Sequence, residues 1–461
     1  MLNILGAQLR KVRIVTGDDA KSSAAAVAAS SVDEGAATVQ LVAEGSKSNL
    51  PVMRDEAKAV LQKLGVPLID CHACPNPCTE NEEHSSLHAV DPSFLRTWSK
   101  QEVDFESELL GTTSPFLRHV LVSTGQRDWP KHIAEVSGSL AQLLSNLAAG
   151  ETETTDDAEE SVPPKGCWGT APAAAARQGL GKRPTKITVS NSSHHSQSDE
   201  LHLESLFVFP DWLCISNVPS LRDAPEQEAI KRSETVKTTY RRWLSPTEPR
   251  DDLPEPAART MCSVLPYSAV ILLCSHKKRD VRCHIAAPVL AEAFKSLAEQ
   301  DGWHVDERGD DCLLTRPPPQ QDGTWSGHVQ QQKRDKDGLQ AERGFGFVEP
   351  GVSIEEQERQ VTAWRKRAAS PSDEKHLGIF YCSHIGGHRY AGNVIIYFPN
   401  GAGVWYGRVS PDPAKGDVAK VWRETVVGGK VIQEFLRAGI NLVRSTPSKA
   451  GQQHFRPIND W

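Results

Sequence analysis

The stretch YSAVILLCSHKKRDVRC at residues 267–283 passes from an apolar run into a polar loop that begins and ends with a cysteine. A second stretch, LGIFYCSHIGGHRYAGNVIIYF at residues 377–398, likewise passes from an apolar run into a loop that holds two histidines. Short apolar runs bounded by polar loops are typical of buried strands. Because α/β folds place their sites at the carboxyl ends of strands, we expect both loops to meet at one edge of a sheet.

The layout of strand, loop and helix occurs twice along the chain, which predicts an α/β fold with two such units. In the first half, an apolar strand at 117–123 precedes a segment, 131–148, whose leucines recur at helical spacing. In the second half, the strand at 267–274 precedes a helix that we expect to begin at Pro288, since proline is favoured in the first turn. The residues PNGAG at 399–403 separate two further strands and predict a hairpin.

The length of 461 residues exceeds what one hydrophobic core usually organises. A low aromatic share of 6% and 30 prolines indicate that part of the chain is unpacked, so we expect two cores with long polar inserts. The predicted division is a disordered tail or weak presequence at 1–45, an N-terminal α/β part at 46–150, a polar insert at 151–200, a strand continuation and linker at 201–260, a second α/β domain at 261–440 that contains a polar insert at 305–375, and a C-terminal tail at 441–461.

Charge and composition exclude several classes of function. A net charge of −7 supplies no overall basic field, so we expect no nucleic acid partner. No apolar run approaches the roughly 20 residues needed to cross a bilayer, so no membrane span is expected. The chain has no Gly-x-Ser-x-Gly elbow, phosphate-binding Gly-rich loop or His-Glu-x-x-His motif, and we therefore expect no hydrolase.

The ten cysteines and the N-terminus bear on the cellular compartment. A low cysteine density without a secretory signal indicates a reducing compartment, where clustered cysteines usually serve metal or redox chemistry. The first 17 residues hold Arg10, Lys11 and Arg13 without an acidic residue, which is a weak mitochondrial presequence signal. We expect the protein to be located in the mitochondrion, with the cytoplasm as the alternative.

The two loops contain four residues that can hold an iron-sulfur cluster. Eight residues separate Cys274 from Cys283, a loop too long for a zinc knuckle, whose paired ligands are about two to four residues apart. His384 and His388 are separated by a segment with two glycines, which favours a loop whose backbone closely approaches a bulky inorganic group. Two thiolates and two imidazoles form the Rieske ligand set of a 2Fe-2S cluster.

Other arrangements of these residues stay open. One alternative is a zinc ion bound by Cys274, Cys283, His384 and His388. Another is that these four residues do not form a common site. The tripeptide Cys-Ser-His occurs at 274–276 and again at 382–384, so His276 and Cys382 are alternative ligands.

A further cysteine cluster, CHACPNPC, occupies residues 71–78. Cys71 and Cys74 form a Cys-x-x-Cys pair, which is typical of a thiol redox couple or of two zinc ligands. Prolines after Cys74 disfavour a helix there, so no helix N-terminus would lower the pKa of the thiols. Redox activity, metal binding and an inert thiol cluster, which includes Cys78, therefore remain alternatives.

Four segments carry a resemblance to a known family: STGQRDWPKHI at 123–133, FPDW at 209–212, CSHKKRDVRC at 274–283 and HIGGHRYAGNVIIYFPNGAGVWYGRV at 384–409. With them the chain resembles the sucrase/ferredoxin-like family of fungi and plants. The resemblance implies thioredoxin-like ferredoxin units and a 2Fe-2S cluster bound by two cysteines and two histidines. The spacing of the two cysteines favours the mitochondrial branch of the family.

The resemblance implies an electron-transfer or redox protein with redox partner proteins that the sequence does not identify. With two thiolates and two neutral imidazoles, the oxidised site is neutral. Its reduction potential should therefore be higher than that of plant-type ferredoxins, which is about −400 mV. The terminal Asp460 and Trp461 resemble a tail that docks on iron-sulfur assembly machinery. A thiol-disulfide oxidoreductase working through Cys71 and Cys74, or a zinc-stabilised interaction module, are the alternative functions.

Overall fold

The computed structural model describes most of the region between residues 90 and 442 and a few segments before it. The described residues are 12–15, 40–43, 55–63, 65–70, 90–113, 116–154, 186–198, 200–245, 260–315, 359–361, 363, 374–383, 385–440 and 442.

The first half of the fold begins with a strand, a helix and a second strand. It contains β4 (Arg118–Ser123), α5 (Leu140–Thr154), β5 (Ile187–Ser192), β6 (Leu203–Phe209), β7 (Leu213–Pro219), α6 (Glu226–Thr239), the π-helical turn η5 (Tyr240–Leu244) and β8 (Met261–Val264). β4 and β5 are parallel, while β6, β7 and β8 follow on the other side of β4 as antiparallel strands.

The second half has the same arrangement. It contains β9 (Ala269–Cys274), α7 (Val281–Gln300), β10 (His304–Asp306), β11 (His376–Cys382), β12 (Val394–Tyr397), β13 (Gly403–Tyr406), α9 (Asp417–Lys420), the π-helical turn η9 (Val421–Val427) and β15 (Leu436–Ile440). β9 and β11 are parallel, and β12, β13 and β15 follow on the other side of β9 as antiparallel strands. The repeated strand, loop and helix that the sequence predicted is therefore present.

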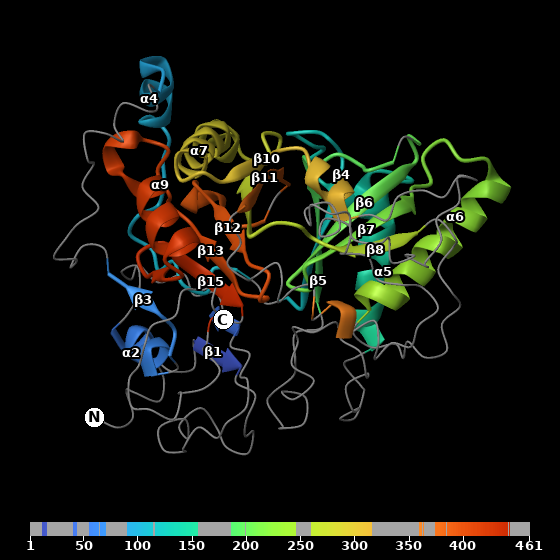
Figure 1. The fold of residues 1–461 in the computed structure, drawn as a ribbon, viewed down its shortest axis with the longest axis horizontal. Helices are drawn as coiled ribbons and strands as arrows, with labels where there is room; N and C mark the ends of the chain where they lie inside the picture. The colour runs from blue at the N-terminus through green and yellow to red at the C-terminus, as the bar shows by residue number, and fades with distance from the viewer. Residues whose placement is uncertain are drawn as a thin grey trace, which may run out of the picture.

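The two halves share one mixed sheet of eleven strands, in the order β15–β13–β12–β9–β11–β5–β4–β6–β7–β8 with β10 beside β11. β5 and β11 join the halves as an antiparallel pair in which Ser192 lies opposite Cys382. α7 and α9 lie on one side of the molecule, α5 and α6 on the opposite side, and the strands between them (Figure 1). The α/β class predicted from the sequence is confirmed.

Aromatic side chains pack the two halves of the sheet against each other. The ring of Phe209 in β6 stacks on that of Tyr397 in β12, with centroids 4.3 Å apart and planes 2° apart. The Phe116 ring meets the Trp405 ring edge to face, with centroids 4.5 Å apart. One hydrophobic cluster thus includes buried residues of both halves, so the sheet halves form a common core.

A second cluster fills the space between the second half-sheet and its helices. It joins Ile271 and Ile379 of the strands to Leu290 and Phe294 of α7 and to Trp422 of η9. Burial of these large apolar groups fixes α7, and with it the loop that precedes the helix, against the end of β9.

Three expectations about local structure are corrected. α7 begins at Val281, seven residues before Pro288, which lies inside the helix, because Asp280 caps the helix. β5 lies within 151–200 and β10 extends from His304 into 305–375, two segments that the sequence assigned to polar inserts. Polar side chains masked β5: Ser190, for example, is buried and hydrogen-bonded to His119 at 3.0 Å.

The remaining elements are short. β1 (Val12–Val15) pairs antiparallel with β2 (Gln40–Ala43), and β3 (Leu68–Ile69), which follows α2 (Asp55–Lys63), pairs parallel with β14 (Val431–Ile432). The others are α4 (Pro92–Trp98) and the 3₁₀ turns η3 (Ile133–Glu135), η6 (Asp310–Thr315), η7 (His388–Tyr390) and η8 (Pro413–Lys415). Within the described part of the chain, no helix combines the length and the apolar character that crossing a bilayer requires.

Candidate metal centre

The two predicted cysteines lie at the carboxyl end of β9 and in the first turn of α7. Cys274 is the last residue of β9, and Cys283 is the third residue of α7. Both are buried, with exposed fractions of 3% and 1%, and they pack together with Ala391. The strand and the helix that connects to it therefore bring the two thiols together, as the sequence predicted.

Asp280 fixes the start of α7 beside these thiols. Its carboxylate accepts a hydrogen bond from the backbone N–H of Arg282 at 2.9 Å, which caps the helix. The guanidinium of Arg282 donates to both carboxylate oxygens, at 2.9 and 2.7 Å, and also donates to the carbonyl oxygen of Glu102 at 2.7 Å. Burial would raise the pKa of Asp280, but the hydrogen bonds and the charge of Arg282 outweigh burial and lower it.

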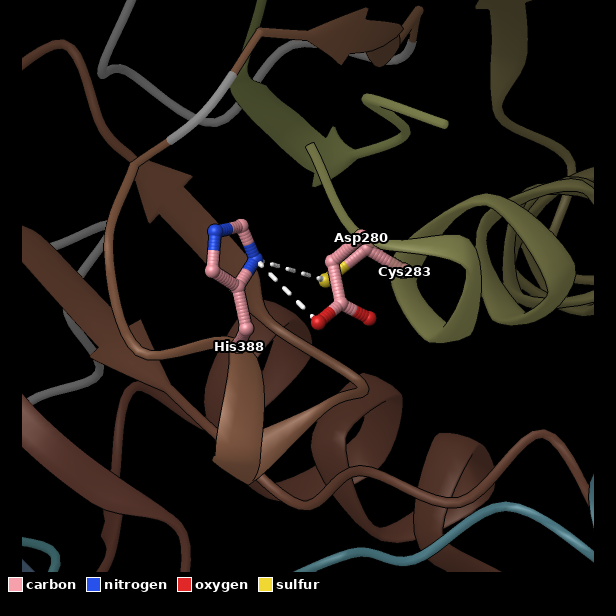
Figure 2. A group of neighbouring side chains, drawn as sticks. All are labelled: Asp280, Cys283 and His388. Atoms are coloured by element: carbon pink, nitrogen blue, oxygen red, sulfur yellow. Dashed lines mark hydrogen bonds and ion pairs between the residues drawn. The ribbon is translucent and has the colours of Figure 1, made fainter. Parts of the chain in front are cut away.

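His388 extends toward the thiols from the loop that follows β11. Its Nδ1 lies 3.9 Å from Sγ of Cys283 and 4.0 Å from Oδ2 of Asp280 (Figure 2). These three ligand atoms lie within 4.8 Å of one another, which is a spacing that one metal centre can bridge. The structure thus brings together Cys274, Cys283 and His388 from the predicted set.

The surroundings of Cys283 favour the protonated thiol over the thiolate, and a bound cation would reverse this preference. The hydrogen bond with Cys274, then burial and the charges of Cys274 and Asp280, raise the pKa of Cys283 well above its ordinary value. Without a cation the buried Cys283 thiol therefore stays protonated. A bound metal compensates the charge of a thiolate, and its binding would release this proton.

Two glycines shape the histidine loop around a buried arginine. Gly386 and Gly387 have φ values of +80° and +69°, in the left-handed region that glycine adopts without a steric cost. A side chain at Gly387 would overlap Nη2 of Arg437, whereas a side chain at Gly386 would touch it only at 4.0 Å. The loop therefore closes directly over the guanidinium, and only glycine fits at position 387.

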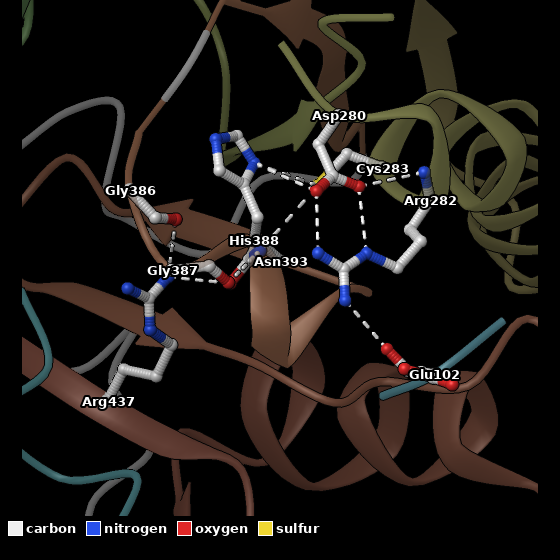
Figure 3. Close-up of polar contacts among 9 residues, drawn as sticks. All are labelled: Glu102, Asp280, Arg282, Cys283, Gly386, Gly387, His388, Asn393 and Arg437. Atoms are coloured by element: carbon white, nitrogen blue, oxygen red, sulfur yellow. Dashed lines mark hydrogen bonds and ion pairs between the residues drawn. The ribbon is translucent and has the colours of Figure 1, made fainter. Parts of the chain in front are cut away.

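Arg437 and Asn393 form the base of the centre (Figure 3). Nη1 of Arg437 donates to Oδ1 of Asn393 at 2.6 Å and to the carbonyl oxygen of Gly386 at 3.3 Å. Nδ2 of Asn393 donates to the carbonyl oxygen of Gly387 at 3.1 Å and lies 3.9 Å from Sγ of Cys283. One hydrogen-bonded chain thus links β15 to the histidine loop and to the thiol.

Arg437 also contributes a positive charge. Its side chain is fully buried, and burial lowers the pKa of Arg437 to about 10. The charges of Cys274, Tyr390 and Cys283 act in the opposite direction and raise this pKa, but burial outweighs them. The guanidinium therefore remains charged at neutral pH. A fixed cation at this place favours thiolates over thiols and favours addition of an electron to a nearby centre.

The alternative ligands of the sequence also lie close to the centre. Nε2 of His276 faces the carbonyl oxygens of Trp129 and Pro130, at 2.9 and 3.1 Å, so this nitrogen carries a proton. It holds the loop that follows β4 by donating to these two carbonyl groups. Cys382 lies beside Cys274 in the register of β9 and β11, and it packs in the core with Phe380.

Several predicted functional residues fall outside the described residues. They are His384, the cluster of Cys71, Cys74 and Cys78, and the terminal Asp460 and Trp461. The neighbours of His384 are described, however: Ser383 directly follows β11, and Ile385 packs against Cys274 and Cys283.

Sequence reasoning missed the residues that support the centre. Asp280 could have been found, because an aspartate before a helical segment is a helix N-cap signal. Asn393, directly before β12, and Arg437, in β15, gave no such signal, because their contacts with the centre form only in the folded chain.

Comparison with known proteins places the chain in a family. Residues 109–438, more than half of the chain, match the model of the sucrase/ferredoxin-like family. Altered inheritance of mitochondria protein 32 of Clavispora lusitaniae is 53% identical over 254 residues, which cover 54% of this chain and 63% of that protein. The protein of the same name from Debaryomyces hansenii is 29% identical over 174 residues, 37% of this chain and 36% of that protein.

A more distant relative aligns over more of the chain. Actin patches distal protein 1 of Saccharomyces cerevisiae is 23% identical over 354 residues, which cover 74% of this chain and 77% of that protein. The chain thus spans less than two thirds of the length of the first two relatives. No solved structure matches the chain, so the thioredoxin-like character of the two halves remains a prediction. Since the family match extends from before β4 into β15 and includes both loops of the centre, the chain belongs to the sucrase/ferredoxin-like family.

Proposed function

We propose that the chain binds a 2Fe-2S cluster through Cys274, Cys283, His384 and His388 and serves as an electron-transfer or redox protein. The observation that carries this proposal is the approach of His388 Nδ1 to Cys283 Sγ, at 3.9 Å, beside the hydrogen-bonded partner thiol. When bound, the cluster supplies a centre that accepts and releases one electron.

The residues present fit such a cluster in chemistry and in charge. Thiolates and imidazoles are the donors that iron-sulfur centres of the Rieske type use. Two thiolates balance the charge of the oxidised core, so the centre would be neutral, which suits a site as deeply buried as Cys274 and Cys283. His384 completes the set as a proposal, supported by the contact of its neighbour Ile385 with the thiols.

Asp280 supports the ligands and is not proposed as one of them. Both of its carboxylate oxygens accept hydrogen bonds from Arg282, and one of them also caps α7. A carboxylate held in this way is well suited to orient His388, as the outer partners of metal-bound histidines commonly do.

A zinc ion bound by the same residues is the competing proposal, and it would make the chain a zinc-stabilised interaction module. Thiolate and imidazole ligands also suit zinc, and the group formed by Asp280, Cys283 and His388 does not by itself distinguish the two metals. The iron and sulfide content and an electron paramagnetic resonance signal distinguish an iron-sulfur cluster from zinc.

The names of the two relatives from Clavispora lusitaniae and Debaryomyces hansenii refer to the inheritance of mitochondria, which supports a role in that organelle. Of the basic residues from which the sequence predicted this compartment, Arg13 lies in β1, whereas Arg10 and Lys11 lie outside the described residues. We further propose redox partner proteins, and iron-sulfur assembly machinery that binds through Asp460 and Trp461. Fractionation of cells that express the chain with and without residues 1–17 tests the compartment.

Electron paramagnetic resonance of the dithionite-reduced protein tests the ligand set. We expect a Rieske-like average g value for the wild type and a shift toward a ferredoxin-like value for His384→Cys and His388→Cys. His284→Cys is the matched control, because His284 is the neighbour of Cys283 on α7 but its Nδ1 lies 3.3 Å from the carbonyl oxygen of Ser275. A wild type without a signal, or variants with unchanged g values, would contradict the proposal.

A further inference from the structure

A second group of metal-binding side chains lies at the start of β11, far from the cysteines. It consists of His304 in β10, Asp311 in η6 and His376 in β11. Nε2 of His304 lies 3.3 Å from Oδ1 of Asp311, and Nδ1 of His376 lies 2.8 Å from Oδ2 of the same carboxylate. The two imidazole rings lie edge to face, with centroids 5.0 Å apart and planes 62° apart.

The backbone holds the two histidines side by side. β10 and β11 are parallel, and His304 and His376 are partners in their register. The backbone N–H of His304 donates to the carbonyl oxygen of Lys375 at 2.8 Å, and the N–H of Ser268 donates to that of His376 at 2.7 Å. Both imidazoles therefore extend from a sheet that is fixed on both sides of His376.

A buried carboxylate fixes Asp311 opposite the histidines. Oδ1 of Asp306 accepts hydrogen bonds from the backbone N–H groups of Arg308 and Gly309, at 2.8 and 2.7 Å. Oδ2 of Asp306 accepts from the N–H of Asp311 at 2.9 Å and from the hydroxyl of Tyr267 at 2.8 Å. The turn is thus built around Asp306, and its geometry orients the side chain of Asp311.

The spacing of the three side chains suits one ion. Ligand atoms at about 2.1 Å from a tetrahedral zinc ion lie about 3.4 Å from each other. The nitrogen–oxygen distances of 3.3 and 2.8 Å are close to this value, and all ligand atoms lie within 4.8 Å of one another. The ammonium group of the neighbouring Lys375 lies over the Trp303 ring, 5.0 Å from its centroid, and not on the carboxylate.

The geometry points to a binding site for one divalent transition metal ion, of the zinc type, formed by His304, Asp311 and His376. Two imidazoles and a carboxylate are donors that zinc binds well, and water would complete the coordination. With an exposed fraction of 57% for the His304 side chain, the ion can reach the site from solvent.

The position of the site in the chain indicates what a bound ion would do. Sixty-four residues separate Asp311 from His376. An ion that binds both would close this long segment at its base, and closing a long loop through a metal stabilises the folded state. The site is independent of the cysteine centre, because His376 and Cys382 lie at opposite ends of β11, about 20 Å apart at about 3.3 Å per residue.

Zinc binding by the full chain tests this inference. Wild type and the His304→Ala/His376→Ala double variant are dialysed against the same free Zn²⁺ concentration, and zinc is measured by elemental analysis. We expect about one zinc ion more per chain in the wild type, and a rise in Tm on zinc addition that the double variant lacks. His202→Ala is the matched control, because His202 forms a surface pair with Glu200 at 3.4 Å but belongs to no group of three metal-binding side chains among the described residues.

A conservative variant separates metal binding from folding. Asp311→Asn keeps the shape of the side chain but removes its charge, and we expect zinc to bind at least about tenfold more weakly. Equal zinc content in the wild type and the double variant would overturn the assignment and reduce the group to an ion-pair network. Zinc that the cysteine centre binds contributes equally to both proteins and so does not affect this difference.

Discussion

At the residue scale, Gly387 tests how tightly the histidine loop encloses Arg437. We predict that Gly387→Ala is destabilising by about 2 to 3 kcal/mol, because it adds a clash with the guanidinium to the cost of a left-handed alanine. Urea unfolding measures the loss of stability, and the visible absorbance of the purified protein measures the loss of bound cluster.

Gly386→Ala is the matched control for this prediction. Its φ of +80° is as unfavourable for alanine, but the added methyl would meet Arg437 only at 4.0 Å. The control should therefore cost about 1 kcal/mol, the strain alone. Equal losses in the two variants would show that the guanidinium does not restrict the loop.

Arg437 itself should change the reduction potential of the proposed redox centre. Because its pKa of about 10 keeps the guanidinium charged at neutral pH, Arg437→Met removes a buried positive charge near both thiols. A charge-assisted interaction of about 1.5 kcal/mol corresponds to a reduction potential lower by about 65 mV for one electron. Potentiometric titration measures the change, and Arg437→Lys, which keeps the charge, should shift the potential less. An equal or higher potential in Arg437→Met would contradict the role of this charge.

Residue types and spacing were sufficient to predict which side chains lie near one another at the candidate centre. Cys274, Cys283 and His388 were chosen because thiols and imidazoles follow apolar runs, and the structure brings these three together. Arg437 was not predicted, because a guanidinium acts on the loop only through a fold that brings β15 beneath it. Local patterns carry no information about such distant partners.

At the element scale, the N-cap of α7 lies beside the thiols of the proposed cluster and stabilises the helix that holds Cys283. We predict that Asp280→Ala lowers the free energy of unfolding by about 1 kcal/mol or more, since it removes the cap and the partner of Arg282. Asp91→Ala, which removes the cap of the exposed helix α4, is the control and should leave the visible spectrum unchanged.

The effect of Asp280 should depend on pH in a defined direction. Its pKa is lowered in the folded state, so the carboxylate contributes stability above its unfolded pKa of about 3.9, and this contribution disappears as pH falls through the folded value. Wild type and Asp280→Ala should therefore differ in urea unfolding at pH 7 and converge toward pH 3. A difference that grows in acid would contradict this.

The helix boundaries show where sequence rules compete. Proline at 288 was expected to open α7, but a proline seven residues into a helix is tolerated here and the capping aspartate decides the start. The strands β9, β11 and β12 were predictable because they are apolar and buried on both faces. β5 was not, because its serines and asparagine resemble a loop until their hydrogen-bond partners are known.

At the scale of the whole molecule, the seam between the two halves has a matching pair of side-chain hydrogen bonds. The backbone N–H of Tyr381 donates to Oγ of Ser193 at 3.0 Å, and the N–H of Asn191 donates to Oγ of Ser383 at 2.9 Å. Replacing either serine by alanine leaves a buried N–H without that acceptor, at a cost of about 1 to 3 kcal/mol.

The two serines precede different histidines, and this difference gives a prediction. Ser383 directly precedes the proposed ligand His384, whereas Ser193 precedes His194 in the other half. Ser383→Ala should therefore lower both stability and cluster content, while Ser193→Ala should lower stability alone. Urea unfolding and iron analysis of the purified variants measure the two effects. Equal cluster loss in both variants would indicate that the seam acts as a whole.

The sequence predicted the repeated layout but not the continuous sheet. The halves meet where Ser192 lies opposite Cys382, a contact between segments far apart in the chain that no local pattern signals. At equivalent register positions, the first half has Ser123 beside Ser192 where the second half has Cys274 beside Cys382. Thiols therefore occur at only one of the two strand-end positions, which predicts one cluster per chain.

The content of iron and acid-labile sulfide in anaerobically purified full-length protein tests the central claim most directly. We predict about two iron and two sulfide per chain, as one 2Fe-2S cluster requires, and their loss in Cys283→Ser. One zinc ion without iron or sulfide at the cysteine centre would contradict the redox function and favour the zinc-stabilised module.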